Sequence, residues 1–403
     1  MRQALVYHPA LMQSKTGSSE ELLRNVSRIL SGSGEFTVWC WYDSENVDPE
    51  LLEEFKKTPH VQLLPFTCSG FNAWPPGKPR NINPTLHDCL KLIGNFIFIS
   101  TVSSGDQWPI TKLPKRIPLI LISPFGDVCS NGNLRCIYVS GDSNYKKLLD
   151  LNISSAKLLF NPIVIPPVKL VKEFDDAKTI IFGRVGRSSS YIFDPISILA
   201  FAKLEAEFGK KVRYIYVNPS AEAKTLVSKL NLKQVLFLDW LSKDKLNELY
   251  DTIDVFAHAR HDGETLGVSI AEAMLHGCPI ITHRSSVANE HLFLVKEPFG
   301  FVTEQDNVQQ YYESMRYFVI NGNKIPVLGF QAREFASRYF DWSAVSGLIL
   351  IECINAYEFI GKPLSLSTRV WHKLLVCLFW IHLITRKLSG KFFPSPTFIY
   401  KKK

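Results

Sequence analysis

The sequence predicts an α/β protein with two doubly wound domains, each built on a mostly parallel sheet, and a C-terminal helical tail. Short apolar runs of strand length alternate with helical patterns along most of the 403 residues, as repeated crossover units require. The alternation breaks once, in the proline-rich stretch 161–170, and then restarts, which indicates a domain boundary there. We therefore expect domains over 1–167 and 168–345, and a tail over 346–403.

The strands expected in the first domain are short apolar runs separated by turn residues. They are Ala4–His8, Thr37–Tyr42, Val61–Phe66, Phe96–Thr101, Pro118–Ser123 and Arg135–Ser140. One helix is expected to begin at Ser18 or Ser19, before apolar residues at helical spacing. Another is expected at Asp48-Pro49, an N-cap followed by proline at the first helical position.

The second domain repeats the pattern. Its expected strands are Thr179–Phe182, Arg213–Val217, Val235–Trp240, Asp254–His258 and Pro279–Thr282. Its expected helices are one from Asp194-Pro195 to Gly209, then 221–230, 243–251, Ser269–His276, 307–320, 330–339 and 342–360. A cleft between two such domains, at the carboxyl ends of the strands, suits a nucleotide-containing ligand.

The positive charge of the chain is confined to its end. The sequence has 46 basic and 38 acidic residues, and 369–403 holds eight of the basic residues and no acid. The rest of the chain is therefore neutral, which argues against a nucleic-acid-binding body. The apolar run 370–385 is shorter than a bilayer span and contains Lys373. We expect a peripheral helix on an anionic membrane surface; the alternative is a helix that packs back onto the protein.

Cysteine usage and the N-terminus indicate a cytoplasmic protein. The eight cysteines form no CxxC pair and no zinc spacing, and most lie in apolar runs, so buried thiols are expected. The first residues read as a core strand, since they lack the charged and long apolar regions of a signal peptide.

The most informative segment is 258–281, HARHDGETLGVSIAEAMLHGCPII. A strand ends, a glycine-containing loop follows, and a helix is expected from Ser269. The first turn of a helix offers unpaired amides and a positive dipole end, which bind diphosphate without a metal. Glu264 and Glu272 lie on either side of that turn. The alternative is a capping box, in which Glu272 only accepts the Ser269 amide.

The segment resembles the nucleotide-binding segment of GT-B glycosyltransferases, particularly the retaining group called family 4. Their signature is two glutamates separated by seven residues and followed by Ala-Met, which is here Glu264-TLGVSIA-Glu272-Ala273-Met274. Looser similarity extends over about 175–345. The resemblance implies two Rossmann-like domains facing a central cleft, and transfer of a sugar from a nucleotide-diphosphate-sugar with retention and without a metal or other cofactor.

The resemblance also implies site residues. Glu264 would contact the transferred sugar, and Glu272 would bind the ribose. The remaining predicted residues would bind the diphosphate: Gly17, Arg184, Leu266, Gly267, Val268 and Ser269. Arg184 and Glu264 are the expected catalytic residues.

One departure from the family concerns charge at the diphosphate. The family usually has a lysine five residues after the arginine, where this chain has Ser189. Arg187 is the candidate to supply that charge; the alternative is a solvated loop arginine. His258 and His261 have metal-like spacing, but no acid or cysteine pattern accompanies them, and we expect no metal site.

The expected partners are a nucleotide-sugar donor and a glycan or lipid-linked acceptor, with no nucleic acid. Two alternatives remain. One is a GT-B protein of different chemistry, such as a nucleotide-sugar epimerase. The other is a catalytically weak sugar-nucleotide-binding membrane adaptor, which the serine at position 189 keeps open.

Overall fold

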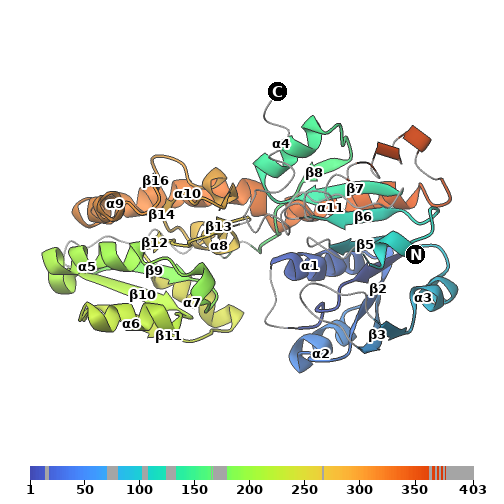
Figure 1. Ribbon diagram of the computed structural model, residues 1–403, viewed down its shortest axis with the longest axis horizontal. Helices are drawn as coiled ribbons and strands as arrows, with labels where there is room; N and C mark the ends of the chain where they lie inside the picture. Colours follow the sequence, from blue (N-terminus) through green and yellow to red (C-terminus); the bar gives the residue numbers. More distant parts are fainter. Residues whose placement is uncertain are drawn as a thin grey trace. The chain divides into compact units, whose positions relative to one another are not determined.

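The computed structural model describes residues 1–13, 18–69, 80–101, 108–123, 133–164, 166, 179–265, 267–362, 365–367, 370, 371, 374 and 377. The chain divides into two compact units (Figure 1). Unit 1 consists of Met1–Pro162 together with Ser343–Lys403, and unit 2 consists of Ile163–Trp342. Both units are α/β with a mainly parallel sheet, which confirms the predicted fold class.

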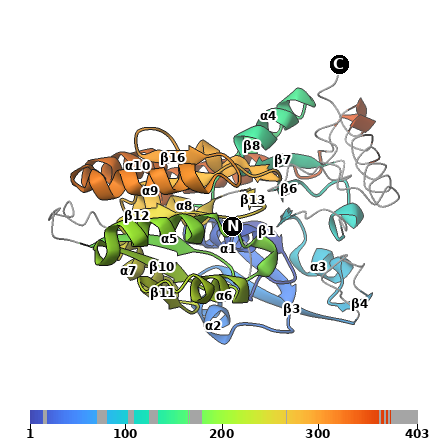
Figure 2. The same ribbon diagram turned by 60° about the vertical axis from the view of Figure 1, so that its left-hand side comes forward.

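Unit 1 contains an eight-stranded sheet in the order β4-β3-β2-β1-β5-β6-β7-β8. The strands are β1 (Arg2–Tyr7), β2 (Phe36–Asp43), β3 (Val61–Ser69), β4 (Arg80–Asn83), β5 (Ile97–Thr101), β6 (Leu119–Ile122), β7 (Leu134–Val139) and β8 (Ala156–Leu158). All neighbours are parallel except β3 and β4, which pair antiparallel at one edge (Figure 2). The six strands predicted for this region are confirmed, and β4 and β8 are additional.

The helices of unit 1 are α1 (Ser18–Gly32), α2 (Pro49–Lys57), α3 (Leu86–Ile93), α4 (Asp142–Asp150) and α11 (Trp342–Tyr357), with a short 3₁₀ turn η1 (Ile110–Lys112). Asp48 caps α2 as predicted, because its carboxylate accepts the amides of Glu50 and Leu51 at 3.0 and 3.1 Å. Through α11 the chain returns to unit 1 after completing unit 2.

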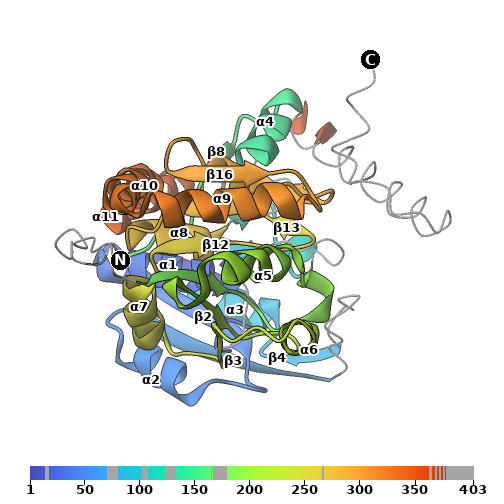
Figure 3. The ribbon, with the colours of Figure 1, turned by 90° about the vertical axis from the view of Figure 1, so that its left-hand side faces the viewer.

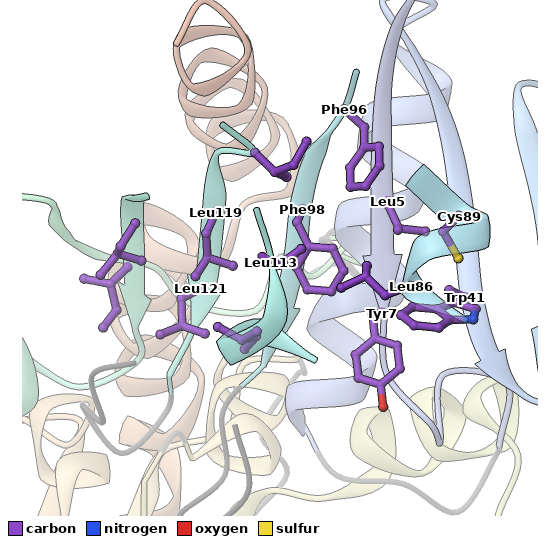
Figure 4. Close-up of a cluster of buried hydrophobic side chains, with 14 of the residues drawn as sticks. Leu5, Tyr7, Trp41, Leu86, Cys89, Phe96, Phe98, Leu113, Leu119 and Leu121 are labelled. Carbon is purple, nitrogen blue, oxygen red and sulfur yellow. The ribbon is translucent and has the colours of Figure 1, made fainter. Parts of the chain in front are cut away.

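The core of unit 1 lies on both faces of its sheet. Leu5, Tyr7, Phe96 and Phe98 point to one face, where they meet Leu86 and Cys89 of α3 and Leu113 after η1 (Figure 4). The alternate residues of β1 and β5, such as Val6 and Ile99, are also fully buried. Burial on both faces explains why these strands are continuous apolar runs and not alternating ones.

Unit 2 contains a parallel six-stranded sheet in the order β11-β10-β9-β12-β14-β16. The strands are β9 (Ile180–Val185), β10 (Val212–Val217), β11 (Val235–Leu238), β12 (Val255–Ala257), β14 (Ile280–His283) and β16 (Gly300–Thr303). Two shorter strands, β13 (Gly263–Glu264) and β15 (Ala288–Asn289), pair separately. The five predicted strands are confirmed, and β16, β13 and β15 are additional.

The helices of unit 2 are α5 (Ile196–Phe208), α6 (Ala221–Lys229), α7 (Lys243–Thr252), α8 (Val268–Leu275), α9 (Val308–Ile320) and α10 (Ile325–Phe340), with 3₁₀ turns η2 (Ser190–Ile192), η3 (Gly209–Lys211), η4 (Glu290–Phe293) and η5 (Gly322–Lys324). Helix α5 packs against α9, and α8 packs against α10 (Figure 3). The predicted helices all form, although α10 begins five residues earlier than predicted.

Two expectations about the chain as a whole can be compared with the structure. Cys40, Cys89, Cys136, Cys278 and Cys353 are free and buried, as predicted, and burial raises the pKa of Cys40 to about 12. In the described part of the chain, no helix is long and apolar enough to cross a membrane. The described tail residues Val370, Trp371, Leu374 and Cys377 are helical and exposed.

Candidate functional site

The candidate site lies where the strand order of unit 2 reverses. After β9 the chain continues to β10 and β11 on one side of β9, and then returns to add β12, β14 and β16 on the other side. In doubly wound sheets, ligands bind outside the carboxyl ends of the strands at this switch point. The predicted segment 258–281 starts directly after β12, so the fold brings it to this position.

Glu264 is held by a short strand pair. It belongs to β13, which pairs with β15 so that Gly263 faces Ala288 and Glu264 faces Asn289. Gly263 has a φ of +67°, and a Cβ there would lie 1.7 Å from the Ala288 carbonyl oxygen. Only glycine fits this close approach, and the pairing it permits fixes the backbone from which Glu264 projects.

The start of α8 is set by a second glycine. Gly267 has a φ of +67° and caps α8 without a side chain, so the helix begins at Val268 and contains Ser269 in its first turn. The first amides of a helix have no intrahelical acceptor, and this end can therefore receive an anion. Leu266, predicted to contribute an amide, lies outside the described residues.

The capping-box alternative is not realised. Ser269 is inside α8 rather than at its cap. The Glu272 carboxylate accepts a hydrogen bond from the Tyr250 hydroxyl at 3.0 Å and another from the Lys243 ammonium. Tyr250 is fully buried; burial, followed by the Glu272 charge, raises the pKa of its hydroxyl well above 10, so it acts as a donor. Glu272 is therefore held by α7, while its side chain retains 13% exposure.

The Glu264 carboxylate is an ion in a largely buried setting. Its Oε1 lies 3.0 Å from Nη1 of Arg260 and 3.7 Å from Nε2 of His258. Burial raises the pKa of Glu264, but the nearby His258 ring and the charge of Arg260 outweigh burial and lower it to about 2. Glu264 is therefore negatively charged at neutral pH and can accept hydrogen bonds from a ligand.

Two histidines pack beside this carboxylate, with ring centroids 5.2 Å apart. Burial lowers the pKa of His258, and its Nδ1 lies 2.9 Å from the Thr282 hydroxyl. Burial and the neighbouring His258 lower the pKa of His291 to about 3. Nδ1 of His291 has no hydrogen-bond partner among the described residues. Both rings are neutral at pH 7, so the charge that Glu264 pairs with comes from Arg260, whose Nε also lies 2.5 Å from the Asp262 carboxylate.

Arg184 joins the two strands that flank the switch point. It lies near the carboxyl end of β9. Its guanidinium donates to the Ala259 carbonyl from Nε at 2.8 Å and from Nη2 at 2.5 Å. Nη1 donates to the Tyr216 hydroxyl, and Cζ lies 4.4 Å from the centre of that ring. Arg184 is only 3% exposed. Two of its five N–H groups have no acceptor in the part of the chain that the structure describes.

The other predicted residues are placed differently. Arg187 is exposed in the loop after β9. His258 is buried and His261 is exposed, and the described residues contain no cluster of three or more His, Cys, Asp or Glu side chains that could hold a metal. Gly17 lies outside the described residues. Arg184, Glu264, Glu272 and the start of α8 thus all belong to unit 2.

Sequence reasoning missed the residues that hold the two glutamates. Lys243 and Tyr250 are 29 and 22 residues from Glu272, and no local spacing connects them to it. The pairing of Arg260 with Glu264 could have been predicted from the sequence, because Arg260 precedes Glu264 by only four residues. Basic residues close to a buried acid are a signal that a motif search overlooks.

Sequence comparison identifies one family. Residues 137–335 match the glycosyl transferases group 1 family. No curated protein sequence matches the chain significantly.

Several solved structures share the fold at low identity. HepE from Anabaena in complex with UDP has a TM-score of 0.65 at 17% identity, over 88% of this chain and 100% of that chain. Sucrose-phosphate synthase from Thermosynechococcus elongatus has a TM-score of 0.64 at 17% identity, over 88% and 99%. A glycosyltransferase from Rickettsia africae has a TM-score of 0.66 at 15% identity, over 90% and 99%. The shared fold is GT-B, as predicted.

The ionised state of Glu264 leads to a prediction about stability. A folded pKa of about 2 against an ordinary value of 4.5 means that Glu264 contributes stability above pH 4.5, which is lost as the pH falls toward 2. This contribution is at most about 3 kcal/mol. The thermal midpoint of wild type should exceed that of Glu264→Gln near neutral pH, and the difference should shrink between about pH 4.5 and 2. A difference that stays constant over that range would contradict the assignment.

Proposed function

We propose that this chain, whose residues 137–335 match the glycosyl transferases group 1 family, transfers a sugar from a nucleotide-diphosphate-sugar to a glycan or lipid-linked acceptor. The donor class is supported by the structural relatives, since HepE is known in complexes with UDP and with UDP-glucose. UDP is therefore the first nucleotide to test. The basic tail, 369–403, favours an acceptor at an anionic membrane surface.

One arrangement carries the proposal: two carboxylates flank the start of α8 at the switch point of a doubly wound sheet. A diphosphate on the amides of Gly267, Val268 and Ser269 would have a carboxylate on either side. Glu272, partly exposed, would accept hydrogen bonds from the ribose hydroxyls. Glu264, ionised and fixed by Arg260, would accept hydrogen bonds from hydroxyls of the transferred sugar.

The reaction needs stabilisation of a diphosphate that gains negative charge. The bond between the anomeric carbon and the phosphate oxygen breaks, the acceptor oxygen bonds to that carbon, and the acceptor proton passes to the leaving phosphate. The α8 dipole and the free donors of Arg184 would stabilise the leaving group, which is the largest catalytic contribution in reactions of this kind. We propose retention of configuration and no metal requirement; the sequence contains no Asp-x-Asp motif.

Acceptor-dependent release of nucleotide tests the transferase. A thermal-shift screen identifies a donor that stabilises the wild-type protein. With that donor, the protein should release nucleotide faster when a competent acceptor is added. The rate of release should be the same with and without EDTA. The anomeric proton of the product in an NMR spectrum should show the donor configuration. Nucleotide released equally without acceptor would favour the epimerase alternative, donor binding without turnover across a panel of acceptors would favour the adaptor alternative, and an inverted product would refute retention.

The role of Glu272 gives a direct prediction. Glu272→Ala should weaken UDP binding by about 1.5–3 kcal/mol, because a set of charged hydrogen bonds is lost. Isothermal calorimetry measures the change. Glu334→Ala, which removes an exposed carboxylate from α10 of the same unit, is the matched control and should bind UDP as wild type does. Equal affinity in wild type and Glu272→Ala would remove Glu272 from the site.

Tyr250 should act through Glu272 as a positioning residue. Tyr250→Phe removes the hydroxyl that orients the carboxylate and should weaken UDP binding by about 1 kcal/mol, raising KM for the donor more than it lowers kcat. Tyr214→Phe is the control, since the equally buried Tyr214 hydroxyl bonds Ser197 at 2.9 Å in the same unit. If both variants weaken binding alike, the effect is one of stability and the positioning role is wrong.

A further inference from the structure

A second concave site lies in unit 1, away from the edge of the sheet where doubly wound domains bind their ligands. Its volume is about 610 Å³. Its lining residues come from the amino ends of β7 and β8, from α11 and from the segment that follows α11; Figure 1 shows where these strands and this helix lie in unit 1. The lining residues that matter for recognition are Arg135, Lys157, Glu352, Asn355, Phe359 and Trp371. Since ligands of such sheets bind at the carboxyl ends of the strands, this hollow has no part in the proposed transfer site.

The hollow contains a cation with unused bonding capacity. The Arg135 guanidinium stacks on Phe359, with Cζ 4.3 Å from the ring centre, and donates to the Lys362 carbonyl from Nη2. Its Nε is shielded from solvent and has no hydrogen-bond partner among the described residues. Lys157 adds a second cation, paired with Glu352 at 3.2 Å. A guanidinium that is held in place by an aromatic ring can donate two parallel hydrogen bonds to a phosphate group.

An exposed apolar stripe begins at the rim of the hollow. Trp371 forms part of the wall and is anchored by its indole N–H, which donates to the Leu151 carbonyl at 2.9 Å. Leu366, Val370 and Leu374 are helical, recur every four residues, and are 70%, 57% and 47% exposed. Residues at this spacing share one helix face. The same segment opens the stretch 369–403, which has eight basic residues and no acid.

We propose that the hollow binds the phosphate-bearing headgroup of an anionic phospholipid, while the stripe of Leu366, Val370 and Leu374 enters the boundary of the acyl chains. Arg135 and Lys157 would contact the phosphate, and Glu352 and Asn355 would contact headgroup hydroxyls. The apolar stripe argues for a lipid over a free phosphate metabolite, because only a lipid pairs a phosphate with apolar surface. The basic tail is complementary to the same surface. This site goes beyond the proposed transfer and does not depend on it.

Vesicle flotation of the full chain tests the proposal. Wild type should bind vesicles of phosphatidylcholine with about one-third phosphatidylglycerol and should bind pure phosphatidylcholine weakly. Arg135→Gln should reduce binding to the anionic vesicles at least about five-fold. Arg213→Gln, which removes an exposed cation from unit 2, is the matched control and should change binding less than about two-fold. Leu374→Gln should weaken binding to both kinds of vesicle.

A second variant covers the case in which Arg135→Gln folds poorly. Lys157 is half exposed, so Lys157→Gln should fold normally and still weaken binding to anionic vesicles. Wild-type binding by both variants would overturn the proposal, as would failure of the full chain to bind anionic vesicles at low ionic strength. Thermal stabilisation by glycerol 1-phosphate without vesicle binding would identify a free phosphate metabolite and also overturn it. UDP binding, measured on the same samples, reports on the transferase proposal separately.

Discussion

The parallel register of β9 with β12 is the constraint on which the candidate site depends. It puts the carboxyl ends of two strands side by side, although the paired residues Phe182 and Val255 lie far apart in the chain, and Arg184 links them by donating twice to the Ala259 carbonyl. The segments that follow β12 start from this hydrogen-bonded position at Ala259. They are the loop with Arg260, the β13–β15 pair and the start of α8. The guanidinium is satisfied by backbone carbonyl and hydroxyl groups rather than by a carboxylate. Burial lowers its pKa, but an arginine stays protonated at neutral pH, so the side chain that links these strands also carries a positive charge.

The two glutamates of this site are in different environments, and the difference suits different tasks. Glu264 is tied to Arg260, lies beside two neutral histidines and has a pKa of about 2, so it presents a rigid charge. Glu272 is held by a buried hydroxyl on one oxygen and by an exposed lysine on the other. Because the Lys243 side chain is 58% exposed, its contact costs little to rearrange. A ligand can therefore approach Glu272 without disturbing the core, whereas Glu264 is already in place. A rigid carboxylate at Glu264 and an adjustable one at Glu272 fit the proposed roles, in which Glu264 contacts the transferred sugar and Glu272 the nucleotide.

The sequence predicted the fold well because its signals are local. Apolar runs, the Asp48-Pro49 cap and the glycine after α5 each involve a few adjacent residues. The strands that were missed, β4, β8, β13, β15 and β16, are only two to four residues long and carry no period that a pattern could reveal. At the site, spacing alone left Glu272 as either a ligand-binding acid or a cap. That choice depends on Gly267 adopting a left-handed conformation and on a tyrosine in another helix, both of which follow from tertiary packing. Lys243 and Tyr250, which hold Glu272, could not be predicted for the same reason.

The path of the chain separates the two proposed activities. After α10 the chain leaves unit 2 at Trp342, and the residues from Ser343 onward belong to unit 1. Helix α11 thus supplies Glu352 and Asn355 to the hollow, and the residues that follow it supply Phe359 and Trp371. The nucleotide recognition proposed above uses described side chains of unit 2, and the proposed headgroup recognition uses side chains of unit 1 and the segment that returns to it. Among the residues that the structure describes, the two sets share no residue and no hydrogen bond. Substitutions in one set should therefore leave the other intact, so donor binding and membrane binding can be measured independently on one protein.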